Sequence, residues 1–322
     1  EKLEAYGVRS EIYSATSYGE MRREGLECDR WNRLHPTMTA KQPWVEQILG
    51  SGTVPVIAVS DNMAAVPDMI RQWVGGHYTV LGTDGFGDDF MKAFVAEGVS
   101  ATDIERSDEL GTGVGLPVVT GDGDNSIIII PQSNDLGDAQ YISRHSKTII
   151  ESDILLLQLE LPIDGNLAAA KLAKENNVTV VLTPAPVAPL AGWEGLVDVV
   201  VPNEGEAAAL TGIEGDVAKQ AEALTKLLGC KYVVITLGPK GAFVTDGDKS
   251  QTISAPAVTA IDTIGAGDTM CANLATRLAS GDDIFTATKF GIYAATLKVT
   301  RKGAAMASPT PDEVQKFISE NN

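Results

Sequence analysis

The sequence predicts an α/β fold with a mostly parallel, three-layer sheet that carries helices on both faces. From residue 154 onward, short apolar segments typical of strands alternate with amphipathic segments typical of helices. The strand segments are continuously apolar, which indicates that both faces of the sheet are covered. Because ligands bind beyond the carboxyl ends of such strands, candidate functional residues are sought there.

The expected elements follow one another in two groups. Before residue 150 the sequence predicts strands at 54–60, 77–81, 114–120 and 126–131 and helices at 67–74 and 90–97. Glycine, aspartate and asparagine residues at 121–125 favour a hairpin turn between the last two of these strands. After residue 150 it predicts strands at 154–160, 178–183, 196–201 and 232–237 and helices at 165–176, 216–228, 267–279, 284–299 and 311–319.

The composition is that of a globular chain and excludes several classes of protein. Of 322 residues, 44% are hydrophobic, and 25 Lys and Arg against 43 Asp and Glu give a net charge of −18. Nucleic acids and anionic membranes are bound by broad basic surfaces, so neither is expected as a partner. No apolar run approaches the ~20 residues of a bilayer-spanning helix. Cys28, Cys230 and Cys271 are odd in number and widely spaced, which predicts a reducing, cytoplasmic location rather than a disulfide framework.

A change in composition near residue 87 indicates two regions of different origin. The first 87 residues contain three of the four tryptophans and carry 8 Lys and Arg against 11 Asp and Glu. The residues that follow carry 17 Lys and Arg against 32 Asp and Glu and are rich in glycine, alanine and valine. The sequence therefore predicts a nearly neutral first region and an acidic second region.

The strongest chemical signal is the segment 262–269, Asp-Thr-Ile-Gly-Ala-Gly-Asp-Thr, at the start of an expected helix. Small residues there allow main-chain N–H groups to converge on an anion, and the helix dipole favours negative charge. A carboxylate such as Asp268 would repel a phosphate, but it is useful if it takes a proton from a hydroxyl group while the amides stabilise a phosphoryl group. The alternative is a glycine-rich helix start with Asp268 in its first turn.

Three further features lie at expected strand ends. The Asn-x-x-Glu spacing of Asn203 and Glu206 can direct Glu206 toward a hydrated Mg²⁺ ion, or it can cap a helix. Thr236 and Gly238 can contact nucleotide phosphates, or they can form a plain turn. Glu160 ends an apolar strand, where a carboxylate is more often solvated than functional.

In this order and on successive strand ends, these features resemble the ribokinase family of sugar kinases. The resemblance runs from about residue 83 to 322, and its most specific part is the Asp-Thr-x-Gly-Ala-Gly-Asp motif at 262–268. Further matching stretches lie at 82–88, 182–186 and 300–304. The segments 157–160 and 299–304 are most similar to the ribose-phosphorylating members of the family.

The resemblance implies transfer of the γ-phosphate of ATP to a sugar hydroxyl, with ribose as the expected sugar and a homodimer as a possible assembly. It implies these roles: Asp268 as base; the amides of Gly265, Ala266 and Gly267 as an anion hole; Asn203, Thr236 and Gly238 for the nucleotide; Glu206 for Mg²⁺; Glu160 for a sugar hydroxyl; Asp262 and Thr263 for an activating K⁺.

Residues 1–87 resemble a different family, the carboxyl-terminal, transketolase-like domain of the homodimeric, thiamin-diphosphate-dependent pyruvate dehydrogenase component. The matching segments are 16–18, 22–36 and 80–87, and the last of these fits both families. In that family the domain supports dimer packing and supplies no thiamin chemistry, so the resemblance implies no catalytic residue here. The expected domains are therefore 1–87 and 83–322.

The first strand of the sugar kinases, with its sugar-binding aspartate, their Gly-Gly-Lys-type loop and their lid have no counterpart in the sequence. Three hypotheses follow: a sugar kinase with an exchanged front end and impaired activity, a fusion that binds nucleotide without phosphorylating a sugar, and a fragment of a 2-oxo-acid dehydrogenase. The sequence leaves open whether the strands at 54–60 and 77–81 lie beside the strand at 154–160 and complete the sheet, or whether an edge of the sheet stays exposed and available for dimer pairing.

Overall fold

The computed structural model describes residues 17–50, 56–60, 70–74, 78–82, 85–107, 110–119 and 125–321. By its internal contacts the chain divides into two units, Glu1–Gly113 and Val114–Asn322. Among the described residues, no helix combines the length and apolar character that a membrane span requires.

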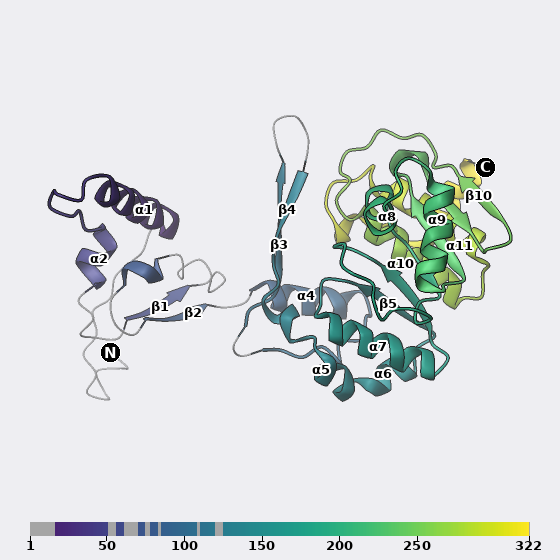
Figure 1. Ribbon diagram of the computed structural model, residues 1–322, viewed down its shortest axis with the longest axis horizontal. Coiled ribbons are helices and arrows are strands. Elements are labelled where there is room, and N and C mark those ends of the chain that lie inside the picture. The colour runs from purple at the N-terminus through teal and green to yellow at the C-terminus, as the bar shows by residue number, and fades with distance from the viewer. Residues whose placement is uncertain are drawn as a thin grey trace. The chain divides into compact units, whose positions relative to one another are not determined.

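The first unit contains a helical part and a small parallel sheet (Figure 1). Its elements are α1 (Tyr18–Leu34), α2 (Trp44–Leu49), β1 (Val56–Ser60), the 3₁₀ turn η2 (Arg71–Trp73), β2 (Tyr78–Gly82) and α4 (Gly85–Ala96). Of the helix expected at 67–74, the structure describes only the part from residue 70, which contains η2; the remainder lies outside the described residues. Gly25 of α1 allows the Trp73 indole to pack closely, since a Cβ atom at Gly25 would lie 2.5 Å from it.

The strands β1 and β2 pair with each other in parallel, with Val56 opposite Tyr78. The sequence leaves open whether they complete the large sheet beside the strand at 154–160, and among the described strands they do not. Each forms its ladder with the other in a separate two-stranded sheet, and the strand that begins at Ile154 pairs only with the strand at Thr179–Thr183.

The second unit is built on a six-stranded sheet in the order β10-β9-β8-β7-β6-β5. The strands are β5 (Ile154–Gln158), β6 (Thr179–Thr183), β7 (Val199–Val200), β8 (Tyr232–Thr236), β9 (Ala242–Thr245) and β10 (Ser250–Ile253). β5 to β8 are parallel, as the sequence predicts, and β9 and β10 add an antiparallel edge. That edge was not predicted, because β10 is a short, largely exposed strand without an apolar run.

The helices of this unit alternate with the strands or follow the sheet (Figure 1). They are α5 (Ala139–Arg144), α6 (Ser146–Ile150), α7 (Ile163–Glu175), α8 (Glu204–Thr211), α9 (Val217–Leu228), α10 (Ala266–Ala279), α11 (Ile284–Lys298) and α12 (Pro311–Glu320), with 3₁₀ turns η3 (Gln132–Leu136), η4 (Gly238–Lys240) and η5 (Ala305–Ala307). A separate hairpin pairs β3 (Val114–Val119) with β4 (Asn125–Ile130) in antiparallel register, as predicted; most of its turn lies outside the described residues.

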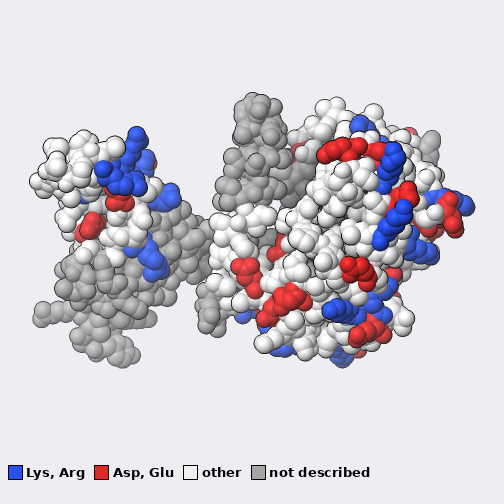
Figure 2. Space-filling view, in the orientation of Figure 1, with Lys and Arg blue, Asp and Glu red and all other residues white. Residues whose placement is uncertain are grey.

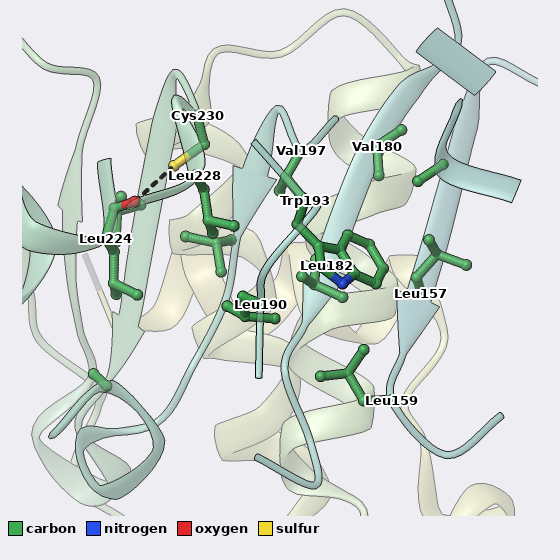
Figure 3. Packing of buried hydrophobic residues seen from close by; sticks show 14 of the residues in the cluster. Leu157, Leu159, Val180, Leu182, Leu190, Trp193, Val197, Leu224, Leu228 and Cys230 are labelled. Carbon is green, nitrogen blue, oxygen red and sulfur yellow. Dashed lines mark hydrogen bonds between the residues drawn. The ribbon is translucent and has the colours of Figure 1, made fainter. Parts of the chain in front are cut away.

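One hydrophobic core lies on each face of the six-stranded sheet, and successive residues of a strand alternate between the two. Val180 and Leu182 of β6 belong to the first core and Val181 to the second. The first core includes buried residues of α7 and α9 around the fully buried Trp193, and Figure 3 shows part of it. The second core includes buried residues of α10 and α11. This is the three-layer arrangement that the apolar strand segments predict.

Charged side chains of opposite sign are interspersed over the face of the molecule that Figure 2 shows. Several charged side chains of the second unit form ion pairs, such as Lys226 with Glu222 and Arg301 with Glu313. The described residues on this face form no broad basic patch.

Candidate active site

The carboxyl ends of β5 to β8 lie at one edge of the sheet because these strands are parallel. The strand expected at 154–160 ends earlier, at Gln158, because the N–H group of Leu159 donates to the carbonyl of Ala185, outside the strand ladder, at 2.8 Å. Glu160 therefore lies beyond β5 rather than in it, and its side chain is exposed.

Asp268 lies in the first turn of α10, and its side chain is exposed. The helix begins after Gly265, which has a left-handed conformation (φ 78°) that favours glycine. Gly267 faces open space, since a Cβ atom there would have no neighbour within 4 Å. The carboxylate is therefore accessible at a helix start to which a ligand can come close.

The amide groups of this turn differ in their hydrogen bonds. The N–H group of Ala266 donates to the carbonyl of Thr263 at 3.2 Å, so it would have to give up that bond to contact a phosphate. Within the described part of the chain, the N–H groups of Gly267 and Asp268 have no acceptor. These two amides and the positive end of the helix dipole are suited to an anion.

Gln158 joins the end of β5 to this turn. Its Nε2 atom donates to Oδ1 of Asp268 at 3.2 Å. An isolated glutamine at a strand end carries no chemical signature, so the sequence predicts no separate role for Gln158. The contact fixes the orientation of the carboxylate relative to the strand edge.

Asn203 and Glu206 form a reciprocal capping box at the start of α8. Oδ1 of Asn203 accepts a hydrogen bond from the N–H group of Glu206, and Oε2 of Glu206 accepts one from the N–H group of Asn203, each at 2.8 Å. Burial raises the pKa of the half-buried Glu206 carboxyl, and the hydrogen bond from Asn203 opposes this shift only in part. The capping interpretation of this pair is therefore confirmed, and Oε1 of Glu206 stays outside the cap.

Thr236 lies beside Asn203, because the two residues form a parallel bridge at the ends of β8 and β7. The N–H group of Thr236 donates to the carbonyl of Pro202 at 2.9 Å. Gly238 begins the turn η4 with φ 56°, is exposed, and has open space where a side chain would be. The structure thus brings these nucleotide candidates together at the strand edge.

The Cys271 thiol lies close enough to the Asp268 and Glu206 carboxylates for their charges to affect its pKa. Cys271 of α10 is buried, and its Sγ atom accepts a hydrogen bond from Thr183, at the end of β6, at 3.3 Å. Burial raises the pKa of Cys271 to about 11, and the negative charges of Asp268 and Glu206 act in the same direction. α10 contacts the ends of β5 and β6 through Asp268 and Cys271, and α8 begins beyond β7 at the same edge of the sheet.

Asp262 and Thr263 lie in the loop that precedes α10. The Asp262 carboxylate accepts hydrogen bonds from the N–H groups of Ile264 and Gly303, each at 3.0 Å, and these bonds lower its pKa. The Nζ atom of Lys298 donates to the main-chain carbonyls of Asp262 and Ile264. The sequence pattern predicts an ordinary helix over Lys298 and indicates no role for this residue.

Comparison with known families identifies the family to which this chain belongs. A family model described as "pfkB family carbohydrate kinase" matches residues 76–311, and one described as "Transketolase-like TK C-terminal domain" matches residues 1–97. The chain belongs to the pfkB family of carbohydrate kinases. The predicted resemblance to ATP-dependent sugar kinases is thereby confirmed at the level of the family.

Members of the pfkB family share both sequence and fold with this chain. Ribokinase from Haemophilus influenzae is 37% identical over 242 residues, which are 74% of this chain and 79% of the relative. The crystal structure of ribokinase from Thermotoga maritima matches with a TM-score of 0.66 at 32% identity and covers 76% of this chain and 82% of that one. The structure of Arabidopsis thaliana ribokinase complexed with ribose and ATP matches with a TM-score of 0.60 at 25% identity and covers 82% of this chain and 80% of that one.

The amino-terminal region is similar to another protein. Pyruvate dehydrogenase E1 component from Pseudomonas aeruginosa is 49% identical over 83 residues, which are 26% of this chain and 9% of the relative. This match confirms the predicted resemblance to a transketolase-like domain. Because so little of that relative is shared, its activity is not carried over to this pfkB family member.

Proposed function

We propose that the chain transfers the γ-phosphoryl group of ATP to a hydroxyl group of a sugar, with ribose as the substrate. The observation that carries the proposal is the first turn of α10, where the exposed Asp268 carboxylate adjoins the N–H groups of Gly267 and Asp268, which have no acceptor among the described residues. A base and an anion site in one turn suit an acceptor hydroxyl and the phosphoryl group that it attacks.

Asp268 accepts the proton of the sugar hydroxyl as the hydroxyl oxygen bonds to the γ-phosphorus. The bond from the γ-phosphorus to the bridging oxygen breaks, and ADP leaves with that electron pair. Main-chain amides at the start of α10 stabilise the negative charge on the transferred group. Those of Gly265, Gly267 and Asp268 have no acceptor among the described residues, and that of Ala266 joins them once it releases the carbonyl of Thr263. Gln158 orients the base through Oδ1.

Asn203, Thr236 and Gly238 form the nucleotide side of the site, where the open space at Gly238 leaves room for a phosphate or ribose group. Mg²⁺ uses few protein carboxylates and retains several waters. A single half-buried carboxylate, Glu206, with Oε1 outside its capping bond, therefore fits this ion. When bound, Mg²⁺ neutralises charge on the β- and γ-phosphates.

The sugar side is formed by Glu160, which would accept a hydrogen bond from a sugar hydroxyl. Ribose is preferred because the Arabidopsis thaliana relative was solved with ribose and ATP. A cytoplasmic setting is supported by Cys28, Cys230 and Cys271, which are free and buried thiols. An activating K⁺ at Asp262 and Thr263 is left out of the proposal, because the Lys298 ammonium group already contacts carbonyl oxygens of that loop.

A second candidate function is nucleotide binding without sugar phosphorylation. The observation that favours it is the edge position of β5, beyond which no described strand pairs. The family's sugar-binding first strand has no counterpart in the sequence. The same edge supports a homodimer, since an edge strand offers N–H and C=O groups to a second copy.

Calorimetry on the whole chain separates the two functions. Mg–ATP is titrated first, then ribose in the presence of a non-hydrolysable ATP analogue, and ADP release is followed with and without ribose. The proposal predicts binding of both ligands and ribose-dependent ADP release. Binding of the nucleotide with neither ribose binding nor ribose-dependent release would contradict it and support the second candidate.

A further inference from the structure

Lys298, the last residue of α11, is a fully buried cation. Its side chain has 0% exposure, whereas lysine is almost never fully buried unless its charge is paired. Its Nζ atom donates to the main-chain carbonyl of Asp262 at 3.1 Å and to that of Ile264. The ammonium group is therefore held by carbonyl oxygens on either side of Thr263.

These carbonyls belong to the loop that sets the start of α10. The N–H group of Ile261 donates to the carbonyl of Val299 at 2.7 Å, so the loop is attached to the end of α11 by its main chain as well. The loop is also held by Gly303, whose N–H group donates to Oδ2 of Asp262 at 3.0 Å. Lys298 thus lies at the centre of the contacts that place Gly265 and the first turn of α10.

The charges around the loop also favour a buried cation. The Asp262 carboxylate accepts hydrogen bonds from the N–H groups of Ile264 and Gly303, each at 3.0 Å, and is thereby held in the same loop as the two carbonyls. The Lys298 ammonium group therefore contacts two carbonyl dipoles, and the negative charge of Asp262 lies in the same loop. This compensation is what a buried charge requires.

The loop does not fit a potassium ion in addition to this lysine. Potassium would bind through carbonyl and carboxylate oxygens, and two carbonyls of this loop are already occupied by Nζ. A second monovalent cation beside a buried ammonium group would be repelled strongly in a medium of low dielectric constant. The potassium site that the family resemblance implies at Asp262 and Thr263 is therefore in conflict with the structure.

We propose that Lys298 is a positioning residue that supplies, as a tethered ammonium group, the monovalent cation of the 262–264 loop, so that the site before α10 needs no potassium ion. The consequence for catalysis rests on the proposed function. The cation requirement of the loop itself can be measured without any catalysis.

Melting temperatures of the whole chain in potassium, sodium and choline chloride, at equal ionic strength, test the proposal. The wild type is expected to melt at the same temperature in all three salts. In choline, Lys298→Ala is expected to melt at a lower temperature than the wild type. Potassium alone is expected to raise the melting temperature of this variant, by about 3 °C when the potassium concentration is ten times its dissociation constant. Lys302→Ala, which removes an exposed positive charge from the neighbouring segment, is expected to show no potassium response.

A potassium-specific rise in the melting temperature of the wild type would overturn the proposal, and this measurement depends on no variant. Absence of a potassium response in Lys298→Ala would also overturn it. If circular dichroism shows that this variant is unfolded in choline, refolding in potassium supports the proposal, and failure to refold in potassium counts against it.

The kinase assay adds a readout that a purely structural lysine would not change. Wild-type turnover is expected to be equal in potassium and choline. The turnover of Lys298→Ala is expected to be about tenfold or more lower in choline, because α10 is misplaced, and to recover in potassium. A loss that potassium does not restore would contradict a cation role. If the wild type phosphorylates no sugar, the proposed function fails, and the melting experiment still decides the role of Lys298.

Discussion

Glu206 and Asp268 are two carboxylates that face one sheet edge from different surroundings. Asp268 is exposed and is contacted by Gln158, whereas Glu206 is half-buried, which raises its pKa. A metal ion must displace the proton of a carboxyl ligand. The proposed Mg²⁺ role of Glu206 is therefore sensitive to pH.

Affinity for a non-hydrolysable Mg–ATP analogue is expected to weaken as pH falls through the raised pKa of Glu206, by up to about tenfold per pH unit. Glu206→Gln, which preserves the capping geometry, is expected to bind more weakly and to lose this pH dependence. Calorimetry over a pH series measures both effects. Glu204→Gln, in the same turn of α8, is the matched control and should behave as the wild type; an unchanged pH profile in Glu206→Gln would exclude Glu206 as the ligand.

At the residue scale, the sequence predicted candidates whose signal lies in a contiguous motif. Gly265, Gly267 and Asp268 were recognised because they occur together before an expected helix. Gln158 and Lys298 were missed, since an isolated glutamine or lysine is normally solvated. Their roles depend on which distant segments the fold brings to them, which no local pattern states.

At the scale of elements, the position of α10 depends on its close approach to α11. Gly291 of α11 packs against the main chain of α10, because a Cβ atom at Gly291 would lie 2.7 Å from the carbonyl oxygen of Met270. The same approach brings Lys298, at the end of α11, to the loop before α10. Helix packing thus connects the core to the site.

Gly291→Ala is expected to destabilise the chain by about 1–3 kcal/mol, because the two helices must move apart. Gly267→Ala is the matched control: its Cβ atom meets open space, and alanine favours the helix by up to about 1 kcal/mol. Urea unfolding of both variants measures the difference. Equal stabilities would show that the approach of α10 and α11 is not tight.

The extent of the elements was predictable where an apolar or amphipathic segment has clear boundaries, as in α9 to α12 and β6. The sequence placed the end of β5 two residues too late, because Leu159 and Glu160 continue the strand pattern although Leu159 bonds to Ala185 instead. It missed β9 and β10, whose pairing depends on a tight turn and on Gly241. A Cβ atom at Gly241 would lie within 3 Å of main-chain atoms at Ile253 and Ala255.

At the scale of the whole molecule, one chain contains regions that match two different families. The carbohydrate kinase model matches from residue 76 and the transketolase-like model up to residue 97. The sequence predicted both parts, because each carries long specific segments. It left the partners of β1 and β2 open, since strand partners depend on tertiary contacts; in the structure these two strands pair with each other.

Thiamin diphosphate with Mg²⁺ is expected not to bind the chain, because the chain spans only 9% of the pyruvate dehydrogenase relative and no catalytic residue is implied for residues 1–87. Melting temperatures with and without the cofactor should therefore coincide, while Mg–ATP raises the melting temperature. A rise with thiamin diphosphate would support the hypothesis of a dehydrogenase fragment.

In the proposed function, Asp268 is the base beside the amides that start α10. This role is tested by the transfer of label from γ-³²P-ATP to ribose by the wild type, by Asp268→Asn and by the control Asp248→Asn, in the exposed β9–β10 turn. We expect a loss of about a hundred- to ten-thousand-fold in Asp268→Asn with nucleotide binding retained, and wild-type transfer in Asp248→Asn. Undiminished transfer by Asp268→Asn would contradict it.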